Sequence, residues 1–153
     1  MTPVTVVFSP SWWFRHYSIS FEEPFYLDPE VRTRNDVLMR KALYERFGIG
    51  QPDPQPRPIL GSRHIAGGFV VPALLGVPIR FASDQAAWPV PQSLGRDAIL
   101  ALRVPDIRRT WPMNILLAQM DEFERRFGCV VGDLNSGGLL NTALELRGQQ
   151  FFI

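Results

Sequence analysis

The spacing of hydrophobic positions along the chain predicts helices that alternate with short strands. In the two longest periodic stretches, apolar residues recur three and four positions apart, as on one face of an amphipathic helix; these stretches are 28–48 and 113–127. Short stretches that are mainly apolar or β-branched instead favour strands, at 4–8, 59–60, 78–81 and 129–131. A shorter helix is expected at 97–102. This order of elements predicts an α/β fold.

The first long helix has clear signals at both ends. Asp28, Pro29 and Glu30 form a typical helix start, with an acidic N-cap, a proline in the first turn and a carboxylate near the positive end of the helix dipole. Gly48 is the expected stop. The residues predicted to face the core are apolar: Val31, Leu38, Met39, Ala42, Leu43 and Phe47. The arginines predicted to face mainly solvent are Arg32, Arg34, Arg40 and Arg46.

The stretch 127–147 carries the strongest functional signal. It predicts a helix end at Gly128, a short buried strand at 129–131, a polar glycine-rich loop and a final helix. Asp133 and Asn135 follow the carboxyl end of that strand, which is the end where α/β proteins bind ligands. We therefore predict Asp133 as a catalytic proton acceptor or hydrogen-bonding group that Asn135 orients.

A dense aromatic and cationic segment, 12–17, follows the first predicted strand and is expected to form a loop. Two interpretations fit this segment. Its rings pack as a cap over one end of the fold, or they line an apolar pocket in which Arg15 and His16 are the polar groups. Arg15 would then bind an acidic group, and His16 would titrate near neutral pH. Under this second interpretation the substrate-binding residues are Trp13, Arg15, His16 and Tyr17.

A glycine-rich loop is expected at 61–68, in the middle of the chain. Its glycines allow a ligand to approach the backbone closely, and its two cationic side chains favour an anionic group. We predict Arg63 and Gly67 as substrate-binding residues and His64 as a catalytic residue that titrates near neutral pH. The alternative is a surface loop with incidental charges. Proline marks two further stretches as an extended connection and a loop, at 51–58 and 84–91.

Composition narrows the classes of function. The 153 residues fit a single domain, 1–153, and the net charge of +1 gives no electrostatic case for nucleic acid or an anionic membrane as partner. No apolar run is long enough to cross a bilayer, and no signal peptide is evident. The single cysteine, Cys129, excludes an internal disulfide or a cysteine-based zinc cluster, and we expect no metal site. A reducing cytoplasm fits these features.

Several segments, taken in order, resemble one enzyme superfamily. The segment 12–15, Trp-Trp-Phe-Arg, resembles the Trp-x-x-Arg of uroporphyrinogen decarboxylases. The segment 69–81 is similar to the superfamily's apolar-Val-Val-Pro-x-x-Leu-Gly stretch and the strand after it. Trp88-Pro89 and the helix, strand and Gly-Gly unit at 113–147 keep the order of the superfamily, which also contains cobalamin-dependent methyltransferases. The resemblance implies a partial (β/α)8 TIM-barrel-like fold with parallel strands.

Two departures from the superfamily shape what the resemblance implies. Decarboxylases carry an acidic residue in a Ser-Asp-Ile-Leu sequence just before Val-Val-Pro, whereas this chain has Ala66-Gly67-Gly68-Phe69 there. The implied activity is therefore closer to corrinoid-linked methyl transfer than to the lyase reaction on porphyrinogens. A whole barrel needs roughly 250 residues, so the chain matches the N-terminal half. The zinc-binding residues of the methyltransferases fall in the other half.

These observations leave three hypotheses about function. The first is an enzyme-related half-barrel that forms part of a small-molecule pocket at the carboxyl ends of its strands, with a corrinoid as the cofactor that the resemblance suggests. The second is a non-catalytic half-barrel that binds a complementary chain, or a second copy of itself, to cover its open sheet edges. The third is a fragment of a longer gene product.

Overall fold

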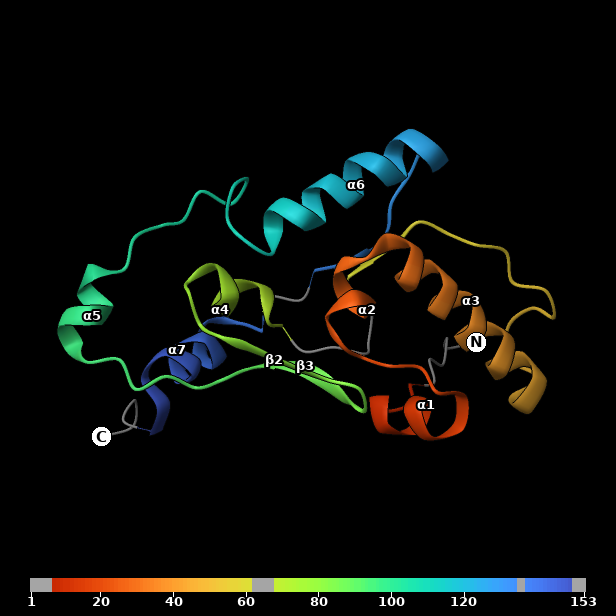
Figure 1. Cartoon of the computed structure of the whole chain (residues 1–153), viewed down its shortest axis with the longest axis horizontal. Coiled ribbons are helices and arrows are strands. Elements are labelled where there is room, and N and C mark those ends of the chain that lie inside the picture. The colour runs from red at the N-terminus through yellow and green to blue at the C-terminus, as the bar shows by residue number, and fades with distance from the viewer. Residues whose placement is uncertain (1–6, 62–67, 135–136, 150–153) are drawn as a thin grey trace, which may run out of the picture.

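A computed structural model describes residues 7–61, 68–134 and 137–149 of the chain. In these residues, helices of different lengths and two small sheets make up the molecule (Figure 1), and most of them contribute to a core rich in aromatic side chains. The elements in chain order are α1 Pro10–Tyr17, α2 Glu23–Leu27, α3 Pro29–Phe47, β1 Ile59–Gly61, α4 Val70–Leu74, β2 Ile79–Ala82, β3 Gln85–Pro89, α5 Arg96–Ala101, α6 Met113–Phe127, β4 Val131–Asp133 and α7 Leu139–Arg147.

The sheets overturn the predicted barrel. Within the described ranges there are two sheets of two strands each: β1 pairs with β4 in parallel, and β2 pairs with β3 antiparallel. The first half of a TIM-like barrel with parallel strands is therefore wrong for these residues. The physical reason lies at Ser83-Asp84, where a tight turn folds the chain back on itself and joins neighbouring strands as a hairpin. The predicted loop at 84–91 is accordingly wrong, because most of it is β3.

Helix α3 confirms the predicted helix limits. The Asp28 side chain accepts hydrogen bonds from the backbone N–H groups of Glu30 (2.9 Å) and Val31 (3.0 Å), as an N-cap does. Gly48 ends the helix in the left-handed conformation, with φ of 67°. The capping residues thus define both ends of α3 from local chemistry alone.

The predicted buried face of α3 is correct only in part. Met39 and Ala42 are buried as predicted, and Val31 and Leu43 are partly buried. Two other residues predicted to face the core, Leu38 and Phe47, are 46% and 44% exposed. Arg32, which was expected in solvent, is 2% exposed, and Asn35 and Asp36 are buried on the same helix. The buried face of α3 is therefore partly polar, and some of its apolar side chains lie on the surface.

The remaining predicted elements are largely confirmed, although one strand starts two residues later than predicted. Helix α6 spans the predicted 113–127 and ends at Gly128, and α5 covers most of 97–102. β1 and β2 lie where short strands were expected. β4 starts at Val131 rather than at Cys129, because its pairing partner Ile59 lies opposite Val131. Most of the predicted strand at 4–8 is outside the described residues, and Val7 and Phe8 are not in a strand.

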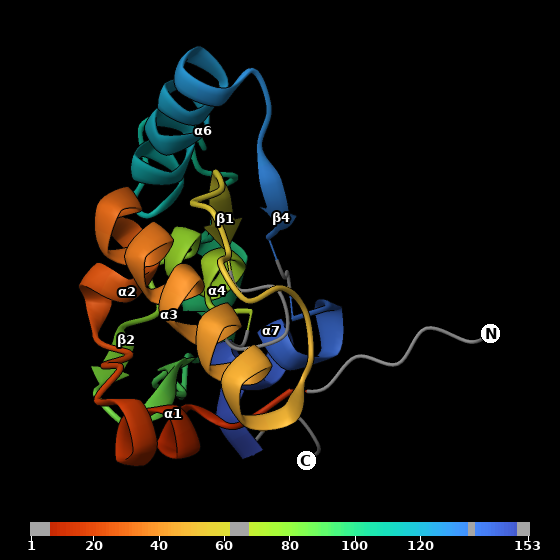
Figure 2. The ribbon, with the colours of Figure 1, turned by 90° about the vertical axis from the view of Figure 1, so that its right-hand side faces the viewer.

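Helices α3 and α6 both pack against β1, which is therefore a central element of the molecule. Figure 2 shows β1 and β4 side by side and pointing the same way, with α7 beyond their ends. The core of aromatic side chains continues from α2 to the hairpin, through ring contacts of Tyr26 with Phe25, Phe69 and Phe81. Of the helices in the described ranges, none is long and apolar enough to cross a membrane.

Candidate functional site at the carboxyl ends of β1 and β4

The carboxyl ends of β1 and β4 meet at one edge of the parallel pair. The register places Gly61 opposite Asp133, so both strands end side by side. Gly68 and Gly137, the first described residues after 62–67 and 135–136, are also close to each other. A Cβ atom added to Gly137 would lie 3.2 Å from the backbone oxygen of Gly68. We call this edge, bounded by Gly61, Gly68, Asp133 and Gly137, the carboxyl edge. It is where α/β proteins usually bind ligands.

Four of the predicted site residues lie outside the described residues: Arg63, His64, Gly67 and Asn135. Asp133 is the last residue of β4, and its backbone is therefore part of the carboxyl edge. The roles assigned to these five residues stay predictions. The described residues on either side of them are nevertheless adjacent, which is the arrangement that a shared site requires.

The aromatic segment is a helix rather than the predicted loop. Ser9 accepts a hydrogen bond from the Trp12 N–H (3.3 Å) and caps α1, which begins at Pro10. Trp13 is buried, whereas Arg15 and His16 are exposed and Tyr17 is half-buried. This distribution favours the packing interpretation for Trp13 and leaves the two cationic side chains in solvent.

Stacked rings explain why this segment is helical and where it packs. Phe8 stacks on Trp12 (centroids 4.2 Å apart) and on Phe47 (5.2 Å), which connects α1 to the end of α3. The Arg46 guanidinium lies over the Trp12 ring at 5.3 Å. Burial of aromatic area, together with these ring contacts, therefore stabilises the junction between the two helices.

A buried ion network on α3 is the polar feature that the sequence analysis missed. Asp36 is 5% exposed, and its Oδ2 accepts hydrogen bonds from Nε of Arg40 (2.8 Å) and of Arg57 (2.9 Å). Its Oδ1 accepts a further one from Nη2 of Arg57 (2.8 Å). Arg40 also donates to the backbone oxygen of Gln55 (2.6 Å). The extended chain that leads into β1 is thereby connected to α3 at two points.

These contacts fix the direction of the chain that leads into β1. Gln55 lies beside Arg40, and Arg57 lies beside Asp36, one helical turn closer to the start of α3. This chain therefore runs antiparallel to α3 before it enters β1, against which α3 packs. The four-residue spacing of Arg32, Asp36 and Arg40 was the available sequence signal for ion pairing, although it gives no information about burial.

Arg32 and Tyr26 are the strongly perturbed groups of this region. Burial lowers the pKa of Arg32 to about 10, although nearby Asp36 opposes the effect. The Arg32 guanidinium lies 4.8 Å from the centre of the Phe25 ring. Burial raises the pKa of Tyr26 to about 12, and the Tyr26 hydroxyl accepts a hydrogen bond from the Ala87 N–H (3.0 Å). At neutral pH the region therefore contains a buried cation beside a neutral phenol.

The electrostatics of this region favour an anionic ligand. The Asp36 carboxylate pairs with Arg40 and Arg57 and acts electrostatically on Arg32, and guanidinium groups bind carboxylates and phosphates. Tyr26 contacts Phe69, which lies next to Gly68 at the carboxyl edge (ring centroids 5.5 Å apart). Across the described residues, no group of three histidine, cysteine or carboxylate side chains is placed to hold a metal ion.

Comparison with known proteins adds no family assignment. No family model matches the chain, and neither the curated proteins nor the solved structures contain a significant match. The resemblance to the decarboxylase and methyltransferase superfamily therefore stays a prediction from the sequence.

Proposed function

We propose that this chain binds a small anionic molecule at the carboxyl edge of β1 and β4, and that it takes part in methyl transfer related to that of corrinoid-dependent enzymes. The observation that carries the proposal is the register that places Gly61 opposite Asp133 in a parallel pair. Parallel strands bring the chain segments after them to a common edge, and those segments contain the predicted site residues. A cytoplasmic location belongs to the same proposal.

Each group near the edge has a distinct role in this proposal. Arg32 and the arginines around Asp36 supply the positive potential that attracts an anion. Asp133 is the proton acceptor or hydrogen-bonding group, and Arg63 and His64 keep the substrate-binding and catalytic roles predicted from the sequence. Decarboxylation of a porphyrinogen receives less support, because Ala66-Gly67-Gly68-Phe69 supplies no carboxylate.

The test is a titration of the whole chain with two probes, each followed separately by amide NMR. Coproporphyrin, which carries carboxylates, tests the preference for an anion, and hydroxocobalamin, which is not an anion, tests the link to corrinoids. Glycine amides are readily recognised, and four of them lie at or next to the carboxyl edge: Gly61, Gly68, Gly132 and Gly137. We expect saturable shifts at these residues with at least one probe, and weaker binding in Asp133→Asn. Gly48 and Gly128, which end α3 and α6, are the internal controls and should not shift.

Three outcomes would contradict the proposal or one of its parts. If neither probe shifts the amide signals of the four edge glycines at millimolar concentration, the proposed site is ruled out. Equal shifts at Gly48 and Gly128 would show that binding is non-specific. If Asp133→Asn keeps its fold and binds the probes as well as the unmodified chain does, Asp133 is not part of the site. The carboxyl edge then loses its main support as the binding site.

A second candidate function is the binding of another chain through β4. Within the described residues β4 pairs only with β1, and Gly132 at its centre is exposed, so one strand edge faces outward. Such an edge can pair with a strand of a partner or of a second copy. Sedimentation at low micromolar concentration distinguishes self-association from the first proposal, because a stable monomer that still binds a probe supports ligand binding alone.

A further inference from the structure

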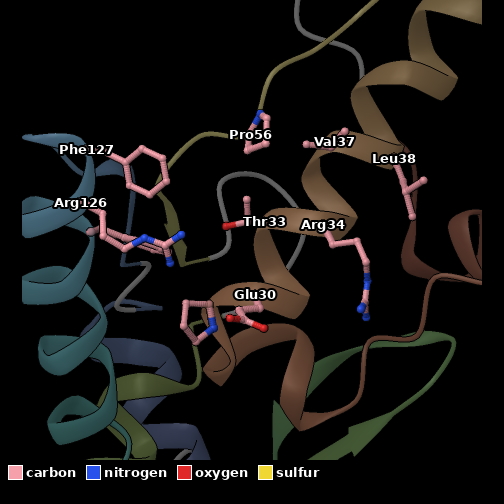
Figure 3. A pocket seen from close by; sticks show the side chains of 10 residues that line it. Glu30, Thr33, Arg34, Val37, Leu38, Pro56, Arg126 and Phe127 are labelled. Atoms are coloured by element: carbon pink, nitrogen blue, oxygen red, sulfur yellow. The ribbon is translucent and has the colours of Figure 1, made fainter.

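An apolar groove separates the outer face of α3 from the last turns of α6. Its volume is about 470 Å³, within the range of small-molecule pockets. Leu38 on α3 and Phe127 on α6 are 46% and 39% exposed, so part of the apolar lining faces solvent. Figure 3 shows Phe127 on one side of this groove, Val37 and Leu38 on the other, and Pro56 between Phe127 and Val37.

One guanidinium points into this groove. Figure 3 shows Arg126 extending from α6 toward Thr33 and Glu30 of α3. The carboxylate nearest to it, Glu122, lies 3.9 Å from Arg126 Nε. The same carboxylate accepts three hydrogen bonds from Arg125, at 2.7, 2.7 and 3.1 Å. Glu122 is thus engaged mainly by Arg125, and Arg126 is only loosely compensated.

The charges that line the groove are positive in sum. Arg34 and Arg126 carry one positive charge each, and Glu30 carries one negative charge. A ligand that fits the lining has an apolar body and one anionic end. A second anionic group would meet Glu30, whereas one carboxylate adds to the loose pairing of Arg126 with Glu122 (3.9 Å) and to its contact with the Phe127 ring (5.4 Å). Guanidinium groups bind carboxylates through two parallel hydrogen bonds.

We propose that the groove binds a small amphipathic monocarboxylate of the alkanoate class, with its carboxylate on Arg126 and its chain against Leu38, Phe123 and Phe127. This site lies on the outer face of α3 and shares none of these residues with the carboxyl edge, so it does not depend on the proposed function. The chain of the ligand removes exposed apolar surface from water, and its head group neutralises Arg126.

The experiment distinguishes the contribution of the head group to binding from that of the alkyl chain. The whole chain of the protein is titrated with octanoate, 1-octanol and acetate. Octanoate is expected to bind most tightly, and acetate is expected not to bind measurably. Arg126→Gln should weaken octanoate about fivefold, the upper end for a half-exposed ion pair, and leave 1-octanol unchanged. Leu38→Ser should weaken both octanoate and 1-octanol. Arg109→Gln, which makes the same change of charge at an 88% exposed side chain outside the groove, should change neither.

Several outcomes would overturn this inference. Equal octanoate affinity in the unmodified chain and in Arg126→Gln would show that the guanidinium does not hold the carboxylate. A loss of the same size in Arg109→Gln would reduce the effect to net charge. Unchanged binding in Leu38→Ser would place the alkyl chain elsewhere. Circular dichroism of each variant confirms the fold, which these exposed positions should not disturb.

Discussion

Helices α3 and α5 are stabilised in very different ways. Helix α3 has a side-chain N-cap at Asp28, a glycine C-cap at Gly48 and a buried network around Asp36. Helix α5 has Gly95 at its N-cap without a side-chain hydrogen bond, and none of its residues is buried. Leu100 on α5 is 66% exposed. Figure 1 shows α5 at the opposite end of the molecule from α3.

The difference separates two sources of helical structure. Local signals suffice to position both helices in the chain, because both occur close to their predicted ranges. Only α3 adds contacts with distant parts of the sequence, through Arg57 and β1. Because short helices are marginal on their own, we expect the free energy of unfolding to depend on α3 and hardly at all on α5.

Removal of the Asp36 carboxylate should cause the largest loss of stability and so give the strongest test of the contrast between α3 and α5. Asp36→Ala removes the carboxylate that pairs with Arg40 and Arg57 and that lies near the almost fully buried Arg32. We expect a loss of about 3–5 kcal/mol in the free energy of unfolding, measured by urea denaturation. Asp106→Ala is the matched control, because that carboxylate is exposed and lies 3.7 Å from Arg109; it should cost less than about 1 kcal/mol.

A methyl group at Gly132 should have the next largest effect, through the parallel pair behind α3. A Cβ atom there would lie 2.0 Å from the backbone oxygen of Leu60, and φ is 124°. We expect Gly132→Ala to lower the free energy of unfolding by about 2–3 kcal/mol, because the strands must separate locally. Gly128→Ala is the control: its φ is also positive, at 69°, but nothing lies within 4 Å, so it should cost about 1 kcal/mol. Equal losses would mean that the close approach to β1 is unimportant.

The smallest effect is expected on α5. Leu100→Ser exposes a hydroxyl where an apolar side chain already faces solvent, and it should change the free energy of unfolding by no more than about 0.5 kcal/mol. The same denaturation experiment measures it. A loss comparable to that of Gly132→Ala would show that Leu100 is buried in solution, and the contrast between α3 and α5 would fail.

The sequence could predict those features that depend on neighbouring residues. Asp28, Gly48 and Gly128 act within one turn of the helices that they cap, and the corresponding helix ends were correct. The buried face of α3 could not be predicted in this way. Its polar half is stabilised by Arg57, which is far along the chain, so the apolar pattern identified Met39 and Ala42 but missed Arg32, Asn35 and Asp36.

The sheets and the candidate site show the same limit. The segment around Trp88 carries proline and was expected to be a loop, yet Trp88 lies opposite Arg80 in a hairpin. The parallel arrangement at the carboxyl edge was expected, but as part of a barrel that the described strands do not form. Arg32 and Tyr26 were not selected as site residues, because their significance depends on burial that no local pattern reveals.

The parallel pairing of β1 with β4 has a consequence for how the molecule assembles. The chain between them contains α4, the hairpin, α5 and α6, so this pairing closes a long loop. During synthesis, α3 and the segment that leads into β1 leave the ribosome well before Val131 does. We expect the ion network on α3 to form first and the carboxyl edge to mature last, because distant pairings form slowly. Until then β1 lacks its partner strand, and the nascent chain should be most sensitive to proteases at this stage.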